Sequence, residues 1–313
     1  MIEGLLFQEL SFGSQTFERS MLIQMEYLET LEPTGPYLTL ILDDPQEKLD
    51  LEGDPSATVT MALDGTRAKI LQEKTSFQTT FSLLKISTLP NFSRRYKLLF
   101  CPQAHRDLLL KKQILLASAT PAQVLAACEL PATVEATLPA VPFSCLHQRK
   151  VQMLLQYADE MGCAFVWNRK LQKLALKSLK DLKSQEVSCE IFTPEYNREH
   201  TAIAVRKLQS DFLSKELHNQ EAFAFDLQEG PQPTKAPPKT RRMPNELVRH
   251  LSQVQFVPEI DWRMTQTFSF GAGSLVELNG EAYLTSRVCW QETENRATVR
   301  VLAGNLYQVE GKL

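Results

Sequence analysis

The chain has 313 residues, of which 43% are hydrophobic and 23% are charged, a composition that excludes a largely disordered protein. Its formal net charge of −3 gives no overall attraction to nucleic acid or to an anionic membrane. The first residues include the acidic Glu3 and no basic run, and no apolar stretch approaches the ~18 residues that a membrane-spanning helix needs. We therefore expect a soluble chain made in the cytoplasm, without membrane insertion.

Residues 1–100 predict a first β domain. Turn signals separate short apolar or alternating segments, which is typical of a small antiparallel barrel or sandwich. The clearest hairpin joins Ala57–Leu63 to Thr66–Leu71 through Asp64-Gly65, because this pair suits a two-residue turn with positive φ at both positions. The other predicted strands are Leu5–Phe7, Met21–Tyr27, Tyr37–Leu42, Phe77–Ile86 and Tyr96–Phe100.

Residues 101–188 predict an α+β domain that begins with a short helix. Thr120-Pro121-Ala122-Gln123 matches a capping box with proline at the first helical position, since the threonine hydroxyl and the glutamine side chain can each bond the other residue's backbone. Val124, Leu125 and Cys128 would then form the buried face of the helix. A connection marked by prolines, from Pro131 to Pro142, leads on to the next element.

The central prediction for this domain is a longer helix followed directly by a hairpin. Apolar residues between Val151 and Met161 recur at helical spacing, and Gly162 is placed to end the helix with a positive φ. Cys163–Trp167 and Leu171–Leu176 then predict two strands, separated by the polar break 168–170. This unit has the character of a scaffold, with β structure on both sides of it in the sequence.

Residues 189–313 predict a second β domain with a Pro-rich loop at 230–244. Asn279-Gly280 between Leu275–Leu278 and Tyr283–Trp290 is the strongest short-range hairpin signal in the chain. The prolines and basic residues of 230–244 favour a loop, and Pro244–Gln253 predicts a short helix. The remaining predicted strands are Glu190–Thr193, Thr201–Leu208, Ala222–Leu227, Thr265–Phe270 and Ala297–Leu302.

The residue types that carry catalysis or metal binding form no recognisable motif, so we predict no catalytic residue, no cofactor and no metal site. The histidines lie outside any nucleophile-elbow context, and the cysteines are scattered without zinc-finger spacing. We expect all six cysteines to be reduced and mostly buried. The histidines are at 105, 147, 200, 218 and 250, and the cysteines at 101, 128, 145, 163, 189 and 289.

Four polar stretches were weighed as sites and are each better explained as ordinary structure. Gly271–Ser274 lies between β segments and lacks the helix that a phosphate loop needs, so it predicts a tight turn. Asp159-Glu160 is expected to face water beside the helix end, and 196–200 is expected to be a loop. The basic segment 235–242 favours a mobile linker, with docking to a partner or polyanion as the alternative.

In their order and spacing, these features resemble the central hub proteins of contractile-tail phage baseplates, and more distantly the late-control D proteins and the hub part of type VI secretion spike proteins. The resemblance covers nearly the whole chain, although each motif alone is weak. The matching segments are Tyr37–Asp44, Gly53-Asp54, Tyr96–Pro102 (like the family's Tyr-x-Leu-x-Leu-x-Pro), Thr120–Leu130, Lys150–Leu176 and Gly273–Val288.

The resemblance implies two similar small antiparallel β-barrels flanking an α+β domain, in a mainly β protein of the α+β class. It implies a non-enzymatic homotrimer in the virion baseplate, in which six similar β surfaces join a six-fold tail tube to a three-fold spike. The implied partners are a tail tube protein, a spike or tail-tip protein and other baseplate proteins. The sequence lacks the oligosaccharide-binding barrel, β-helical repeat and lysozyme-like segment found in some relatives, so a separate spike tip and no cell-wall cleavage are expected.

Two other functions stay open at the level of sequence. One is a carbohydrate or cell-surface binding module, in which Trp262, Trp290 or Tyr283 would stack on sugar rings. The other is a cell-wall hydrolase, whose paired carboxylates cannot be recognised among 37 acidic residues. Phe92, Trp262 and Trp290 would alternatively anchor a subunit interface, but we expect them in the core.

Overall fold

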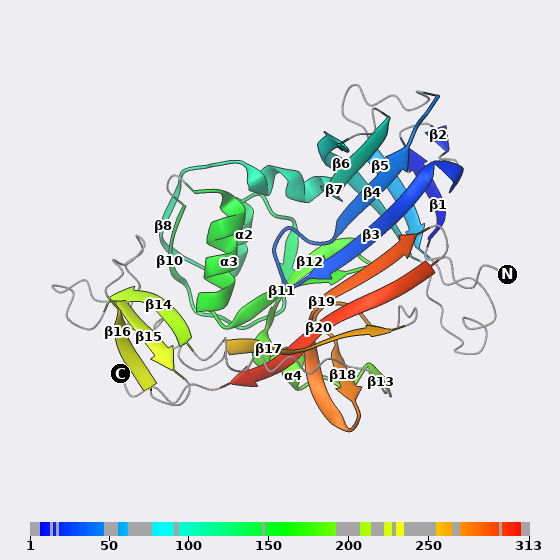
Figure 1. Ribbon diagram of the computed structural model, residues 1–313. Coiled ribbons are helices and arrows are strands. Elements are labelled where there is room, and N and C mark those ends of the chain that lie inside the picture. Colours follow the sequence, from blue (N-terminus) through cyan, green and yellow to red (C-terminus); the bar gives the residue numbers. More distant parts are fainter. Residues whose placement is uncertain are drawn as a thin grey trace.

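The computed structural model describes residues 7–12, 15–16, 19–46, 56–61, 77–90, 94–145, 148–191, 207–213, 222–226, 230–234, 255–264, 270–293 and 296–307 (Figure 1). Twelve strands form one large sheet: β1 (Phe7–Phe12), β2 (Gln15–Thr16), β3 (Leu22–Thr30), β4 (Tyr37–Asp43), β5 (Ser56–Met61), β6 (Phe77–Thr88), β7 (Arg95–Pro102), β13 (Cys189–Ile191), β17 (Gln255–Met264), β18 (Leu275–Leu278), β19 (Glu281–Thr293) and β20 (Arg296–Tyr307). The remaining elements are η1 (Arg19–Met21), η2 (Gln103–Leu109), β8 (Ile114–Ala119), α2 (Pro121–Ala127), β9 (Ala132–Val134), β10 (Val141–Cys145), α3 (Lys150–Glu160), β11 (Cys163–Asn168), β12 (Lys173–Ser178), α4 (Leu179–Lys183), β14 (Lys207–Leu213), β15 (Ala222–Asp226) and β16 (Gly230–Thr234).

The large sheet contains two four-stranded units with the same topology. In the first unit the spatial order is β4-β7-β6-β5, and in the second it is β17-β20-β19-β18, with every ladder antiparallel. If the strands of each unit are numbered along the chain, both orders are first-fourth-third-second. The middle ladder of each unit, β6–β7 in the first and β19–β20 in the second, also carries a β-bulge. The extra residue is Leu84 in β6 and Ser286 in β19, and each of these is the third strand of its unit along the chain. The two β regions therefore share both strand order and the position of an irregularity.

Strand β3 joins the two units into one continuous sheet. One edge of β3 pairs with β4, with Tyr27 opposite Leu38, and its other edge pairs with β19, with Tyr27 opposite Trp290. In Figure 1, β3 lies beside β19, with β20 beyond it, although β3 and β19 are at opposite ends of the sequence. Among the described strands, the ladders form an open path, so the prediction of two closed barrels is not confirmed while the mainly β, antiparallel character is.

A single hydrophobic core serves both units. Tyr27 packs edge-on against Phe81 of the first unit, with ring centroids 6.2 Å apart. It also packs against Trp290 of the second unit in a tilted arrangement, with centroids 5.5 Å apart. Trp262 and Trp290 are 2% and 0% exposed, which confirms that they belong to the core. Tyr283 is also buried, at 3%. The alternative function in which these three side chains would stack on sugar rings is not supported, because all three are buried.

The two helices and the hairpin predicted for the α+β part are present, together with elements that were not predicted (η2, β8, β9, β10 and α4). Thr120 caps α2 and accepts a hydrogen bond from the Gln123 backbone N–H at 3.4 Å, while the Gln123 side chain accepts one from the Thr120 N–H at 2.9 Å. Gly162, with φ +61°, follows α3 and precedes the β11–β12 hairpin. These elements enclose a second core that includes Val124, Leu125, Cys128 and the buried face of α3.

One part of the predicted hairpin is wrong. Leu171 does not begin the second strand but lies in the turn with 60% of its surface exposed, and β12 begins at Lys173. The turn is longer than predicted because Asn168 Oδ1 accepts hydrogen bonds from the backbone N–H groups of Lys170 and Leu171, both at 3.0 Å. Gln172 completes the turn with φ +53°.

Two further segments differ from the prediction. The hairpin predicted for 57–71 is not among them, because its turn and second strand lie outside the described residues, although both edges of β5 are occupied, by β1 and by β6. Gly230–Thr234, predicted as loop, forms the edge strand β16, which tolerates prolines at alternate positions because their missing N–H groups share one edge. Strand β17 was not predicted at all.

Several predictions lie outside the described residues and stay predictions. They concern segments on either side of the described strands and the whole basic loop. They are Leu5 and Leu6, Gly53-Asp54, Thr66–Leu71, Phe92, His147, 192–206, His218, 235–254 and 265–269, the last two including the predicted helix Pro244–Gln253 and most of the strand Thr265–Phe270.

Candidate functional site

Glu29 in β3 is an acidic residue within the core and is only 1% exposed. Alternate residues of a strand share one face, so Glu29 lies on the same face as Met25 and Tyr27, both of which belong to the core. A charge at such a position requires a partner of opposite charge and hydrogen bonds to its remaining lone pairs. The structure supplies both from distant parts of the chain.

Arg169, in the turn between β11 and β12, is the charged partner of Glu29. Its Nε lies 2.7 Å from Glu29 Oε1 and its Nη2 lies 3.1 Å from Oε2. This is a bidentate salt bridge, which a lysine could not make. Nη2 also donates to the carbonyl oxygen of Phe270 at 3.0 Å. The guanidinium carbon lies 4.9 Å from the centroid of the Trp290 ring, a cation–π contact.

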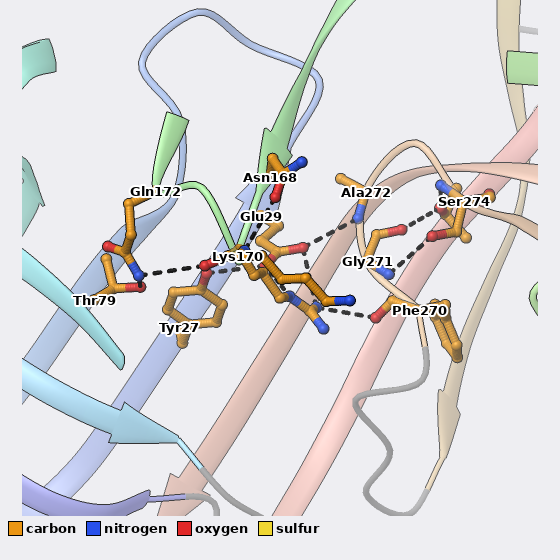
Figure 2. Close-up of polar contacts among 12 residues, drawn as sticks. Tyr27, Glu29, Thr79, Asn168, Lys170, Gln172, Phe270, Gly271, Ala272 and Ser274 are labelled. Atoms are coloured by element: carbon orange, nitrogen blue, oxygen red, sulfur yellow. Dashed lines mark hydrogen bonds and ion pairs between the residues drawn. The ribbon is translucent and has the colours of Figure 1, made fainter. Parts of the chain in front are cut away.

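Two more donors complete the coordination of the Glu29 carboxylate. The Tyr27 hydroxyl donates to Oε1 at 2.9 Å, and the backbone N–H of Ala272 donates to Oε2 at 3.3 Å. Figure 2 shows Glu29 between the Tyr27 side of the sheet and the turn that carries Gly271 and Ala272. A Cβ on Gly271 would lie 2.2 Å from Oε2, so only glycine allows this approach.

The turn 271–274 is thus a tight β-turn, as predicted, and its backbone binds the protein's own carboxylate. It is held in place by Thr285 of β19, whose hydroxyl donates to the carbonyl oxygen of Gly271 at 2.7 Å. Ser274 Oγ accepts from the Gly271 N–H at 3.1 Å. The anion-binding capacity that the glycines suggested is therefore used within the chain.

The electrostatics keep Tyr27 and Arg169 each in one protonation state. Burial raises the pKa of Tyr27 well above its ordinary value, and the neighbouring Glu29 carboxylate raises it further. Burial disfavours the charge of Arg169, but the Glu29 carboxylate more than compensates, so the pKa of Arg169 is also raised. Tyr27 stays a hydrogen-bond donor and Arg169 stays charged at every physiological pH, which suits a structural contact.

Gln172 extends the contact from the hairpin turn to the first β unit. Its side-chain nitrogen donates to Thr79 Oγ1 in β6 at 3.2 Å (Figure 2). The same nitrogen also donates to the carbonyl oxygen of Gln78. Together, Arg169 and Gln172 fix one hairpin turn against β3, β6 and the segment before β18. We call the residues Tyr27, Glu29, Arg169, Gln172, Phe270 and Ala272 the polar junction.

Two further contacts hold the α+β part against the sheet. His105 Nδ1 lies 2.8 Å from the carbonyl oxygen of Thr34, and its ring meets that of Trp167 edge-on at 5.6 Å. Burial lowers the pKa of His105 to about 4, so its ring is neutral and Nδ1 donates. On the other side, Lys183 of α4 donates to the Ala282 carbonyl oxygen and to Asn305 Oδ1, both at 2.7 Å. The α+β part is thereby fixed to both β units.

The structure gives little chemical reactivity to the other predicted residues. All six cysteines are free, four are buried, and burial raises the pKa of Cys101, Cys128, Cys163 and Cys289 to about 12, so these remain thiols. Asp159 faces water as predicted, whereas the same prediction for Glu160 is wrong, because Glu160 is 2% exposed. Within the described ranges, no group of three or more His, Cys, Asp or Glu residues could hold a metal ion.

Sequence reasoning missed the polar junction, although a signal for it was present. Glu29 stands at a core position in the alternation of β3, and a carboxylate there predicts a buried partner. The identity of that partner could not be predicted, because Arg169 lies 140 residues away in what was interpreted as a polar break.

In the described part of the chain, no helix is long and apolar enough to cross a membrane.

Comparison with known proteins shows the class of fold. No model of a known protein family matches the chain, and no curated protein matches its sequence. Among solved structures, the 43 kDa tail protein of prophage MuSo2 from Shewanella oneidensis matches 94% of this chain and 97% of its own length, with TM-score 0.58 and 9% identity. The tail protein from Neisseria meningitidis MC58 matches 95% of each chain, with TM-score 0.54 and 10% identity.

A third match extends the same fold to secretion systems. The Escherichia coli c3393 protein, described as a component of the type VI secretion system with structural similarity to the T4 bacteriophage tail proteins gp27 and gp5, matches 95% of this chain and 76% of its own. The TM-score is 0.56 and the identity is 8%. The chain thus has the fold of phage tail proteins and of a related secretion component, over nearly its whole length.

Proposed function

We propose that this chain is the hub subunit of a phage-type tail baseplate, a structural protein that forms a homotrimer. The observation that carries the proposal is the whole-chain match with phage tail proteins, in which 94% of this chain aligns with 97% of the Shewanella oneidensis protein. A match of this extent concerns the complete arrangement of β units and α+β part rather than one common domain. Because the sequence identity is 9%, the match supports the shared fold. The trimer and its partners are our inference from that fold.

The repeated topology of the two β units supplies the physical reason for a hub. Three copies of a chain with two similar units present six similar surfaces around one axis, which suits a six-fold tail tube on one side and a three-fold spike on the other. The like orders β4-β7-β6-β5 and β17-β20-β19-β18 support this arrangement. Closed symmetric contacts would also cover the sheet edges that a monomer leaves unpaired.

The polar junction has a mechanical role in this proposal. A symmetry adaptor works only if its two β units keep one fixed relation, since the six surfaces must match a regular ring. The β3–β19 ladder and the buried Glu29–Arg169 pair, together with Lys183, fix the two units and the α+β part to each other. A continuous sheet with an open polar cleft would argue instead for a binding site, but here the Glu29 carboxylate is 1% exposed and is occupied by protein groups.

The mass of the purified protein tests the proposal. Native mass spectrometry is expected to give about three times the 35.5 kDa of one chain. A monomer whose migration is retarded by polysaccharide would instead support a carbohydrate-binding module and would contradict the hub. The proposed partners are the tube protein and spike protein encoded with the same tail, together with other baseplate proteins, and the proposed location is the virion baseplate.

A further inference from the structure

Two like-charge pairs of opposite sign stand directly across backbone ladders on different sides of the molecule. Lys111 and Arg149 form an isolated antiparallel bridge just before β8 and α3, and both side chains are exposed. Glu190 of β13 and Glu277 of β18 are partners in a parallel ladder. Like charges directly opposite one another destabilise a β pairing, so each pair costs free energy in an isolated subunit. A facing surface of opposite charge would offset that cost.

The basic pair borders an exposed apolar surface. Leu110, next to Lys111, is 59% exposed, and Leu115 of β8 is 75% exposed, the most of any large hydrophobic residue described. Strands β8 and β10 (ILLASA and VPFSC) carry no charged residue and pair only with each other among the described strands. We call Leu110, Lys111, Leu115 and Arg149 the basic face.

Neighbouring groups do not neutralise the basic face. Lys112 and the buried Lys150 share one carboxylate, that of Glu129, at 2.6 and 2.9 Å. These two lysines hold the pKa of Glu129 at about 2, so the carboxylate is committed to them and this triad still carries one net positive charge. Lys111 and Arg149 take part in none of the ion pairs found among the described residues. The face is therefore both apolar at its centre and positive at its border.

The acidic pair lies on an edge of the large sheet. Strand β13 is the terminal strand of the sheet path, so its outer edge has no strand beside it in the described part of the chain. Glu190 is exposed, Glu277 is partly exposed, and the preceding Glu186 and Val187 are exposed as well. We call Glu186, Val187, Glu190 and Glu277 the acidic face. Lys183, which precedes these residues in the chain, donates its hydrogen bonds to Ala282 and Asn305.

We propose that the basic face of one copy docks on the acidic face of the next, so that copies of this chain close head to tail into a ring. The two faces lie well apart, with β8 and β10 at the left of Figure 1 and β13 and β18 at the lower right. Different faces on different sides give a heterologous contact, which generates a ring when the rotation closes. Each like-charge pair then meets the opposite charge, and Leu110 and Leu115 are covered by the partner copy.

The inference rests on the proposed homotrimer and names its contact surfaces. The test is a charge exchange followed by native mass spectrometry and sedimentation. Lys111→Glu with Arg149→Glu, or Glu190→Lys with Glu277→Lys, places like charges on both sides of the contact. Each double variant is expected to weaken trimer formation by about a hundredfold or more, because facing like charges cost several kcal/mol.

The four substitutions combined exchange the two faces and are expected to restore the trimer. A matched control, Lys85→Glu with Lys97→Glu, changes the charge equally on exposed positions of β6 and β7 and is expected to leave the trimer intact. Circular dichroism and thermal unfolding check that every variant is folded, and the restored trimer makes the result independent of any loss of stability.

The outcomes separate the two proposals. If the unaltered chain is a monomer, the proposed function fails and the docking inference fails with it. If the unaltered chain is a trimer and the two double variants remain trimers, the docking inference alone is overturned. The same holds if the fourfold variant stays monomeric although it is folded, or if the control pair also dissociates.

Discussion

At the scale of single residues, the Glu29–Arg169 pair is the contact whose loss should cost most. Glu29→Gln keeps the size of the side chain but leaves the Arg169 guanidinium buried without its counter-charge. We expect the free energy of unfolding to fall by about 3 kcal/mol or more, measured by denaturant titration. Asp261→Asn is the matched control, because Asp261 pairs with the 59% exposed Arg300 and its loss should cost less than about 1 kcal/mol. Equal losses would contradict the structural importance of the junction.

His105 makes a prediction about pH. Its pKa in the folded chain is about 4, against 6.5 for the free side chain, so the unfolded state binds a proton that the folded state rejects. The stability from neutral His105 is present above pH 6.5 and is lost as the pH falls toward 4, by about 3 kcal/mol in total. His105→Asn should show a smaller decrease in unfolding free energy over this range. An unchanged decrease would show that other groups cause it.

Glu29 also shows what the sequence can and cannot predict about the site. The alternation of strand 22–30 places Glu29 on the buried face, and that much follows from local pattern alone. The partner, the Ala272 N–H and the Trp290 ring follow only from long-range folding, because they come from segments 140 to about 260 positions away. Charges that are far apart in sequence give no periodic signal by which to pair them.

At the scale of elements, the tight turn after β3 gives a further prediction. Gly35 has φ +69°, and a Cβ there would lie 2.6 Å from His105 Nδ1. Gly35→Ala should therefore lower the free energy of unfolding by about 2–3 kcal/mol, through backbone strain and displacement of the His105 ring. Gly280→Ala is the control, because Gly280 has φ +88° but open space around its Cβ position, so only the strain of about 1 kcal/mol remains. Thermal unfolding compares the two.

Elements with strong local signals were predicted well, and elements chosen by competition between distant strands were not. The capping box of α2, the glycine after α3 and the Asn-Gly turn each satisfy backbone groups within a few residues, so the sequence determines them locally. The Asp64-Gly65 turn and its second predicted strand lie outside the described residues, while β1 and β6 occupy both edges of β5. Strand β16 was predicted as a loop because it contains prolines. It forms a strand nevertheless, because prolines on an edge strand cost no ladder hydrogen bond.

At the scale of the whole molecule, the two similar β regions were predicted from the family resemblance and not from composition or periodicity. Their identical strand order supports that part of the resemblance, while the β3–β19 ladder connects the two regions directly. This ladder pairs Thr30 with Arg287, and no local pattern reports such a register. The domain boundaries at 100 and 188 stay predictions within one continuous sheet.

The central claim is that three copies of this chain present six similar β units around one axis. Electron cryomicroscopy of the purified assembly, averaged without imposed symmetry, measures this directly. We predict a three-fold ring in which the β4-β7-β6-β5 and β17-β20-β19-β18 units alternate at one radius, about 60° apart as in a ring of six. A monomer, or a ring in which the two units lie at clearly different radii, would contradict the claim.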